Sequence, residues 1–146
     1  MTNMLFYIYL GTVVAFNAHT VVDTSPANGQ VYVFSQTVFN HGGGYNNVAG
    51  VFTAPVSGVY MFTVHLCSLP GHYPHIAFVK TGGSEIVKGA MGDSSAHSCH
   101  VATAVTVLTH DETVWVQCTY DTGTTLYANG HRLNTFAGSL LQQMHG

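Results

Sequence analysis

Histidine and cysteine are the side chains of this sequence whose spacing could support chemistry. The chain has ten His and three Cys among 146 residues. His72-Tyr-Pro-His75 offers two imidazoles in a Pro-containing loop, and His97-Ser-Cys-His100 offers two imidazoles and a thiol at the start of an expected strand. Imidazole and thiolate are good ligands for Zn²⁺ and Cu²⁺. The candidate metal ligands are therefore His72, His75, His97, Cys99 and His100.

The geometry of a strand limits what these residues can do together. If residues 97–100 are extended, His97 and Cys99 lie on one face and His100 lies on the other. One strand then supplies two ligands at best, and a tetrahedral site needs help from the loop of His72 or from another subunit. Two alternatives are weak multivalent binding of divalent metals and a surface on which imidazoles take the place of Lys and Glu as polar cover.

Enzyme motifs are not recognisable. The sequence has no HExxH, GxSxG, P-loop or dinucleotide-binding fingerprint, and Gly42-Gly-Gly44 is interpreted as a loop tip. A triad of Ser98, His97 and Asp93 can be drawn, but any His-rich chain allows such a drawing. We therefore expect no catalytic residues and no required cofactor.

A turn-rich segment between the late strands is the candidate ligand surface. It combines aromatic rings with amide and guanidinium donors, which suit sugars and carboxylates. The ligand candidates are Tyr120, Tyr127, Asn129, His131 and Arg132. An ordinary loop is the alternative interpretation.

Charged residues are scarce, and this excludes one class of partner. Three residues are Lys or Arg and six are Asp or Glu, so only 6% of the chain is charged. Three scattered cations cannot neutralise a run of phosphates, which excludes nucleic-acid binding. The longest apolar stretch, residues 4–16, is interrupted by Tyr, Gly and Thr and is shorter than the ~20 residues of a membrane span. We expect no membrane span.

Short runs of alternating polarity must position these side chains. Residues 31–39, 58–66, 101–108 and 113–117 alternate and are rich in Val, Thr, Tyr and Phe, the residues that favour strands. Clusters of Gly, Pro, Asn and Asp separate the runs, and no long stretch keeps a helical apolar spacing. The sequence predicts eight to ten strands in two packed sheets, and no α-helix.

A set of aromatic, Asn and Gly residues at fixed intervals resembles a known family. The phrase Gly50-Val-Phe-Thr-Ala-Pro-Val-Ser-Gly-Val-Tyr-Met-Phe62 is similar to the signature of the C1q domain, and flanking blocks continue the similarity over about residues 13–144. We expect residues 13–146 to be a C1q-like domain and residues 1–12 to be an apolar lead-in or a degenerate or truncated signal. The matching positions are Phe34, Asn40, Tyr45, Phe52, Gly58, Tyr60, Phe62, Trp115, Phe136 and Gly138.

This resemblance implies an all-β, ten-stranded jelly-roll sandwich of the C1q/TNF type that assembles as a compact homotrimer. The sequence has no collagen-like Gly-X-Y segment and is similar to stalkless C1q-domain proteins of bivalve molluscs, many of which are secreted, lectin-like recognition molecules of innate immunity. The implied role is non-enzymatic and extracellular, with glycans or microbial surface ligands as partners. The alternatives are a His-rich carrier of divalent or heavy metals in an extracellular fluid and a structural matrix protein.

Three details depend on the same resemblance. The family topology places the strands of Cys67 and Cys99 side by side, so one hypothesis is a Cys67–Cys99 bridge with Cys118 free, and the other is three buried thiols. The family binds calcium through acidic loops near residue 98, but here only Asp93 is close, so the calcium site is in doubt. Asp111 stands at a turn where the family commonly has Gly, and Asp tolerates the left-handed backbone region better than most residues.

Overall fold

The computed structural model describes residues 11–121 and 126–145 of the chain. Its described residues form strands and connecting loops without a helix, so none of them provides a helix that could cross a membrane. The expected lead-in, residues 1–12, lies almost wholly outside the described residues. The strands are β1 (Ala15–Val21), β2 (Phe34–His41), β3 (Tyr45–Asn46), β4 (Val51–Thr53), β5 (Gly58–Ser68), β6 (His75–Lys80), β7 (Ser84–Ala90), β8 (Ser98–Leu108), β9 (Thr113–Cys118) and β10 (Thr135–Gln143).

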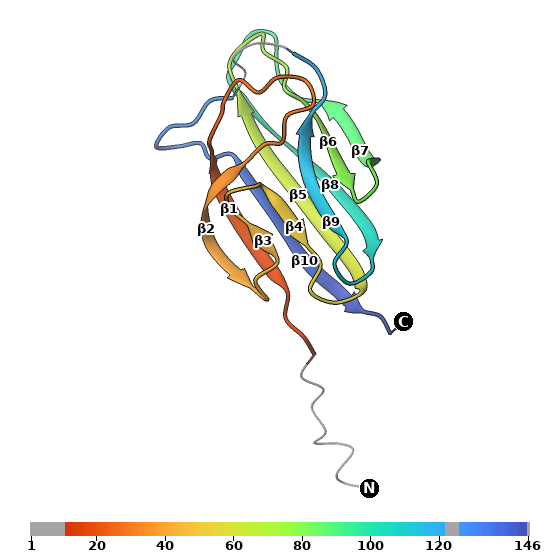
Figure 1. Cartoon of the computed structure of the whole chain (residues 1–146). Helices are drawn as coiled ribbons and strands as arrows, with labels where there is room; N and C mark the ends of the chain where they lie inside the picture. The colour runs from red at the N-terminus through yellow and green to blue at the C-terminus, as the bar shows by residue number, and fades with distance from the viewer. Residues whose placement is uncertain (1–10, 122–125, 146) are drawn as a thin grey trace, which may run out of the picture.

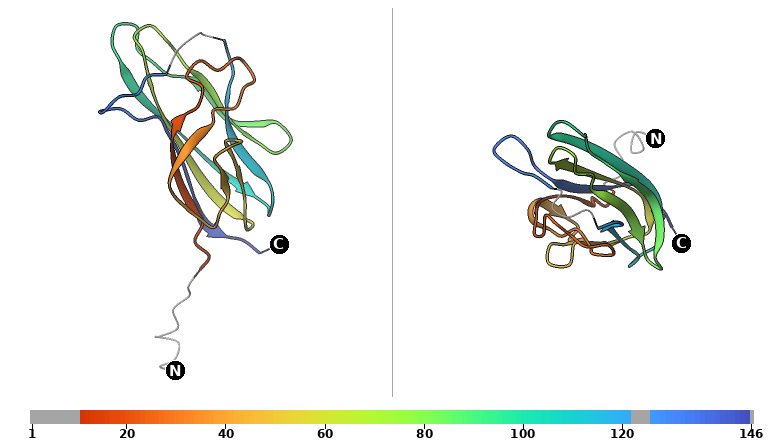
Figure 2. Two further views of the ribbon diagram at one scale, coloured as in Figure 1. Left: turned by 60° about the vertical axis from the view of Figure 1, so that its left-hand side comes forward. Right: turned by 90° about the horizontal axis from the view of Figure 1, so that it is seen from above.

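The strands form two five-stranded antiparallel sheets that pack face to face (Figures 1 and 2). Sheet A has the order β2-β1-β10-β5-β8, and sheet B has the order β3-β4-β9-β6-β7. The longest strands, β5 and β8, pair in register over their whole length, from Gly58 opposite Leu108 to Ser68 opposite Ser98. The predicted jelly-roll sandwich without helices is confirmed for the described residues.

Aromatic rings fill the space between the two sheets. Along β1, β9 and most of β5, alternate residues are buried because successive side chains of a strand lie on opposite faces. The ring of Phe16 stacks on that of Tyr45 at 4.8 Å between centroids and meets that of Phe136 edge-on at 5.0 Å. Trp115 differs from the other signature aromatics: its side chain is only partly buried, and its Nε1 donates to Gln117 Oε1.

Two glycines of the family signature allow close approaches that a larger residue would prevent. A Cβ atom at Gly58 would lie 2.5 Å from the carbonyl oxygen of Gln142, and one at Gly138 would lie 2.6 Å from the ring of Phe62. Asp111 occupies the left-handed region with φ 73°, as expected for a residue that replaces Gly at this turn. The two glycines therefore allow β5 and β10 to pair closely within sheet A.

Candidate functional site

The end of β5 and the segment that precedes β10 enclose an open pocket of about 630 Å³. Its walls come from sheet A and from a tight turn at Gly130. The lining residues are His65, Cys99, Asn129, Gly130, His131, Arg132, Leu133 and Thr135. Three of the five predicted ligand candidates, Asn129, His131 and Arg132, therefore lie together at one pocket.

Backbone hydrogen bonds fix the turn that carries these three residues. The N–H groups of Asn129 and Arg132 each donate to the other residue's carbonyl, at 3.2 and 3.4 Å. The N–H of His131 donates to Asn129 Oδ1 at 2.8 Å. The side-chain oxygen of Asn129 is therefore used by a hydrogen bond within the turn, and the side-chain N–H₂ group can donate to neighbours.

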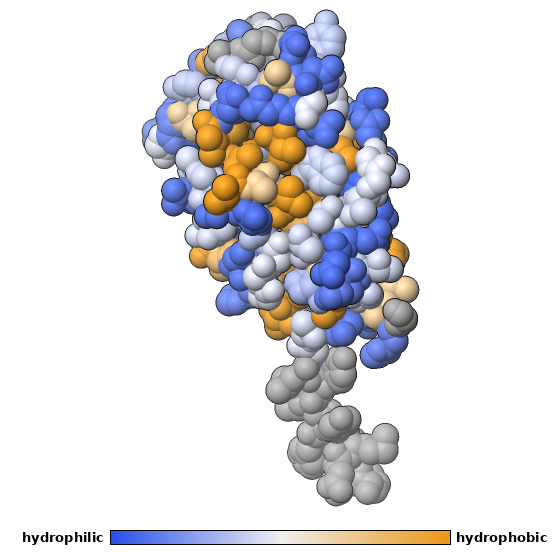
Figure 3. All heavy atoms as spheres, in the orientation of Figure 1, coloured by the Kyte–Doolittle hydropathy of each residue, from blue (hydrophilic) through white to orange (hydrophobic). Residues whose placement is uncertain are grey.

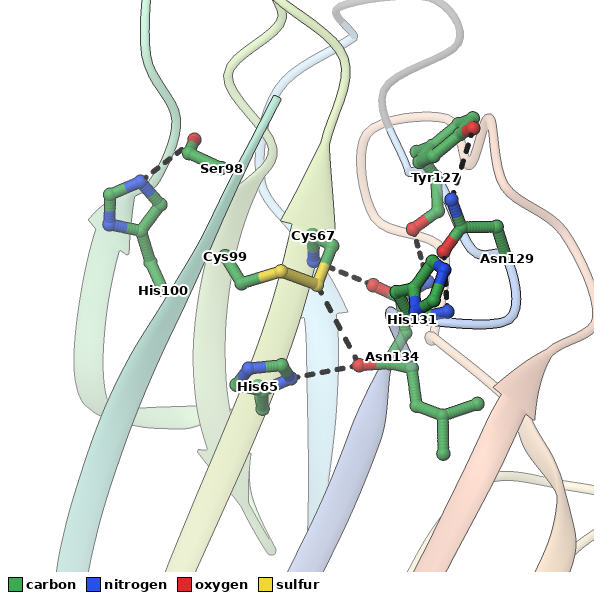
Figure 4. The surroundings of a disulfide bond; sticks show 10 residues. His65, Cys67, Ser98, Cys99, His100, Tyr127, Asn129, His131 and Asn134 are labelled. Carbon is green, nitrogen blue, oxygen red and sulfur yellow. Dashed lines mark hydrogen bonds between the residues drawn. A yellow bond between two sulfur atoms is a disulfide. The ribbon is translucent and has the colours of Figure 1, made fainter. Parts of the chain in front are cut away.

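A buried asparagine attaches this turn to the end of β5 (Figure 4). Asn134 is 2% exposed, its Oδ1 accepts from the N–H of Cys67 at 2.7 Å, and its Nδ2 donates to the carbonyl of Tyr127 at 3.4 Å. The N–H of Tyr127 in turn donates to the carbonyl of Cys67 at 2.9 Å. Sequence reasoning did not single out Asn134, because its role depends on which strand the turn packs against.

Positive charge in the pocket is not neutralised by a carboxylate. Ion pairs among the described residues join Lys88 to Glu85 and His110 to Asp111, and none involves Arg132. The lining contains the single Arg of the chain and two His, and no Asp or Glu. The pocket therefore presents donors and a permanent positive charge to a ligand.

A disulfide joins Cys67 to Cys99, and Cys99 lines the pocket (Figure 4). The two residues lie directly opposite each other on β5 and β8, with their Cα atoms 3.9 Å apart. Cys118 is free and buried. The hypothesis of a Cys67–Cys99 bridge with Cys118 free is confirmed, and the alternative of three thiols is wrong.

A histidine that sequence reasoning missed lies beside the disulfide. His65 Nδ1 lies 2.8 Å from the carbonyl oxygen of Leu133. One ligand atom each from His65, Cys67 and Cys99 lie within 4.8 Å of one another. A signal for this group was present, because His65 and Cys67 are two residues apart and therefore share one face of β5.

The five predicted metal ligands do not form one group in the described structure. His75 Nδ1 lies 2.7 Å from the carbonyl oxygen of Tyr73, and its ring packs on Tyr120 at 5.0 Å. Tyr120 is accordingly not part of the pocket lining. No group of three ligand atoms among the described residues includes His72 or His75, so metal binding at this loop stays a prediction.

The candidate ligands of the second predicted segment, residues 97–100, also have separate partners. The ring of His97 packs on that of Tyr127 at 4.7 Å, and His100 Nε2 lies 3.0 Å from Ser98 Oγ. Cys99 is bonded to Cys67. A metal site at these residues therefore stays a prediction, and as long as the bridge is intact it has no thiolate at Cys99.

Asp93, the carboxylate closest to the family's calcium position, closes a turn. Its Oδ1 accepts from the N–H of Ser95 at 2.8 Å and from the N–H of Ala96 at 3.1 Å. The hydrogen bonds from Ser95 hold the pKa of Asp93 below its ordinary value. Asp93 belongs to no group of three potential metal ligands among the described residues, so the calcium site remains in doubt.

The outward face of sheet A is apolar along β5 and β8. Val101, Val105 and Val107 of β8 are 60%, 55% and 48% exposed, and Met61 lies opposite Val105 on β5. On β1 of the same sheet, Asn17 Oδ1 is buried without a hydrogen-bond partner. Figure 3 shows the molecule in the orientation of Figure 1, with an apolar cluster in the upper half and smaller apolar spots toward the lower end among mostly hydrophilic residues.

Comparison with known proteins agrees with this architecture. A family profile described as C1q domain matches residues 15–141. The mouse collagen alpha-1(X) chain is 26% identical over 125 residues, which are 82% of this chain and 17% of that protein, so the chain spans less than a fifth of this relative's length.

Solved structures show the same fold at low sequence identity. The globular domain of zebrafish complement 1qA protein matches with a TM-score of 0.73 and 21% identity, covering 90% of this chain and 99% of that one. Eiger TNF from S. frugiperda matches with a TM-score of 0.71 and 12% identity over 93% and 97% of the two chains. Murine APRIL matches with a TM-score of 0.65 and 13% identity over 89% and 100%.

Proposed function

Because the chain belongs to the C1q domain family, we propose that it is a non-enzymatic, extracellular recognition protein that binds glycans as a homotrimer. The observation that carries the proposal is the pocket at the end of β5, in which Arg132 has no carboxylate partner among the described residues. Recognition of microbial or self surfaces in innate immunity is the role that this activity would serve.

The chemistry of the pocket favours sugars that carry a carboxylate. The guanidinium of Arg132 is planar and pairs with a carboxylate through two parallel hydrogen bonds. Asn129 and His131 add further hydrogen-bond donors beside it for hydroxyl or acetamido groups. The turn that holds all three is fixed by its own hydrogen bonds before a ligand arrives, which reduces the entropy lost on binding.

Assembly into a trimer would give a higher affinity for glycan surfaces than one open pocket provides. The exposed valines of β8 lie on the outward face of sheet A, where a second copy of the chain would cover them. A cyclic trimer repeats one such contact three times. Three pockets on one rigid body bind a repeating glycan surface much more tightly than one pocket does.

Binding is tested with a polymer that bears sialyllactose and a matched polymer that bears lactose, immobilised on a biosensor. Wild type should bind the sialylated polymer, and Arg132→Gln should weaken binding at least tenfold, because a charge-assisted hydrogen bond contributes about 1.5–3 kcal/mol. Lys88→Gln is the matched control, since it removes another exposed positive charge, on β7 of the other sheet. Equal losses in the two variants, or no preference for the acidic polymer, would contradict the proposal.

Assembly is tested by sedimentation of Val105→Lys and Val48→Lys. Val48 is 84% exposed and lies in the loop between β3 and β4 of sheet B. We expect wild type and Val48→Lys to sediment as trimers and Val105→Lys to sediment as a folded monomer, because an ammonium group buried in an interface is costly. A trimer of Val105→Lys would exclude this face.

A further inference from the structure

We propose that reduction of the Cys67–Cys99 disulfide creates a site for a soft divalent cation such as Zn²⁺ or Cd²⁺, with His65, Cys67 and Cys99 as its ligands. The proposal does not depend on glycan binding. It rests on the geometry of these three side chains, on the hydrogen bond of His65 and on the access that the pocket provides.

The three ligand atoms are already close to the spacing of a metal site. They lie within 4.8 Å of one another, whereas the ligands of tetrahedral zinc lie about 3.5–3.8 Å apart, given Zn–S and Zn–N bonds of about 2.3 and 2.0–2.1 Å. Reduction lets the two sulfur atoms separate to that distance.

The backbone holds Cys67 and Cys99 opposite each other without the bridge. Their strands, β5 and β8, pair continuously from Gly58 to Ser68, and the N–H of Cys67 is held by Asn134. The Cα atoms of the two cysteines are therefore kept in position by the sheet after the S–S bond is broken. The site would be preorganised, and metal binding would need little folding.

The hydrogen bond of His65 leaves the correct nitrogen available. A carbonyl oxygen only accepts, so Nδ1, which lies 2.8 Å from the carbonyl oxygen of Leu133, carries the proton of the neutral ring. The lone pair then belongs to Nε2, and Figure 4 shows the ring of His65 lying directly beside the disulfide. A metal-bound histidine commonly donates its other N–H to such a carbonyl, which fixes the orientation of the ring.

The pocket gives a reductant and a metal ion access to the disulfide from the side of Cys99. Cys99 is exposed and lines the pocket together with His65, whereas Cys67 is fully buried. A fourth coordination position is available to water or to His131, which lines the same pocket. Arg132 in that lining would favour the thiolate forms of the reduced cysteines.

The chemistry is balanced with a thiol as the reductant. Two thiols give up two electrons and two protons and leave as their own disulfide, while Cys67 and Cys99 become thiols. Binding of Zn²⁺ then releases both protons as the thiolates coordinate. In the oxidised chain both thiolates are lost, and only the imidazoles of His65 and His131 remain in the pocket as weak donors. Reduction of the disulfide therefore strengthens metal binding, and bound metal in turn favours the reduced form.

The test uses Zn²⁺ and Co²⁺ with oxidised protein and with protein reduced by dithiothreitol and desalted under argon. Reduced wild type should bind one Zn²⁺ per chain in competition with a chromophoric chelator and should show thiolate-to-Co²⁺ charge-transfer absorption. Oxidised protein should bind Zn²⁺ at least tenfold more weakly and should show no thiolate-to-Co²⁺ charge-transfer absorption. His65→Gln should weaken Zn²⁺ binding by the reduced chain at least tenfold, whereas His100→Gln and Cys118→Ala should not change it.

Circular dichroism of each sample distinguishes loss of the site from loss of the fold. A reduced chain that is folded, or that refolds on one equivalent of Zn²⁺, supports the proposal when the effect depends on His65. Equal zinc affinity of reduced wild type and reduced His65→Gln would overturn it. Equal uptake by oxidised and reduced protein, or a reduced chain that stays unfolded with Zn²⁺, would overturn it as well.

Discussion

The hydroxyl of Tyr45 completes the hydrogen bonding of an edge strand, and its removal is the sharpest test of the packing described above. β2 is the edge of sheet A, and both backbone groups of Phe34 on that strand bond to Tyr45. The hydroxyl donates to the carbonyl of Phe34 at 2.7 Å and accepts from its N–H at 3.1 Å. One side chain thus takes the place of a neighbouring strand.

Tyr45→Phe keeps the ring in the core and deletes only this hydroxyl. Phe34 would then have two buried backbone groups without partners, and each costs about 1–3 kcal/mol. Because β2 is at an edge, water can relieve part of the loss. We expect the free energy of unfolding to fall by about 2–4 kcal/mol.

Tyr60→Phe is the matched control. The hydroxyl of Tyr60 donates to one acceptor, the carbonyl of Val56, at 2.6 Å, so its loss should cost about 0.5–1.5 kcal/mol. Urea denaturation at one protein concentration, followed by circular dichroism, gives both values. Equal losses in the two variants, or a loss below about 1 kcal/mol in Tyr45→Phe, would refute the idea that this hydroxyl completes the edge of β2.

Three further predictions concern pH and backbone geometry. Burial raises the pKa of Tyr45 from 10.0 to about 12. The contribution of the protonated hydroxyl to stability is therefore complete below pH 10 and is lost as the pH rises through 12. Urea titrations at several alkaline pH values should show that the free energy of unfolding declines less steeply with pH in Tyr45→Phe than in wild type. Gly138→Ala should lower the unfolding free energy by about 1–3 kcal/mol, because a Cβ there would press on the rings of Phe62 and Phe16, and a melting curve measures this. Asp111→Gly should raise the free energy of unfolding by about 0.5–1 kcal/mol, because Gly adopts the left-handed backbone conformation of this position without strain. Asp111→Ala should lower the free energy of unfolding.

The strands and the disulfide could be predicted because they depend on local alternation and on a topology that the signature residues indicate. The alternating run at 58–66 lies within β5, which extends from Gly58 to Ser68. The run at 31–39 does not match its strand, because β2 begins at Phe34. Val31 instead forms an isolated bridge with Gln117 of sheet B, so this segment passes from one sheet to the other. Alternation does not reveal such a crossing.

The predicted metal site shows where strand periodicity stops being informative. The expectation that His97 and Cys99 share a face requires both to lie in the strand, but β8 begins at Ser98. His97 is therefore free of the alternation and packs on Tyr127, a residue far along the chain. Cys99 does follow the alternation, and its partner comes from β5. A residue in an expected strand could be placed from the sequence, whereas one just outside it depended on tertiary contacts.

The outward face of sheet A carries both the proposed trimer interface and the proposed metal site. Along β8, Cys99 and Val105 point to the same side and are six residues apart, which is about 20 Å in a strand. The disulfide is thus at one end of the face with Val101 two residues from it, whereas Val105 and Val107 lie toward the other end, and continuous pairing with β5 joins them. Reduction can alter the pocket while that pairing keeps the valines in place. If reduced protein loses its trimers as well as its pocket, the bridge must stabilise the whole β5–β8 pair; if it keeps its trimers, assembly and metal binding are separate properties of one sheet.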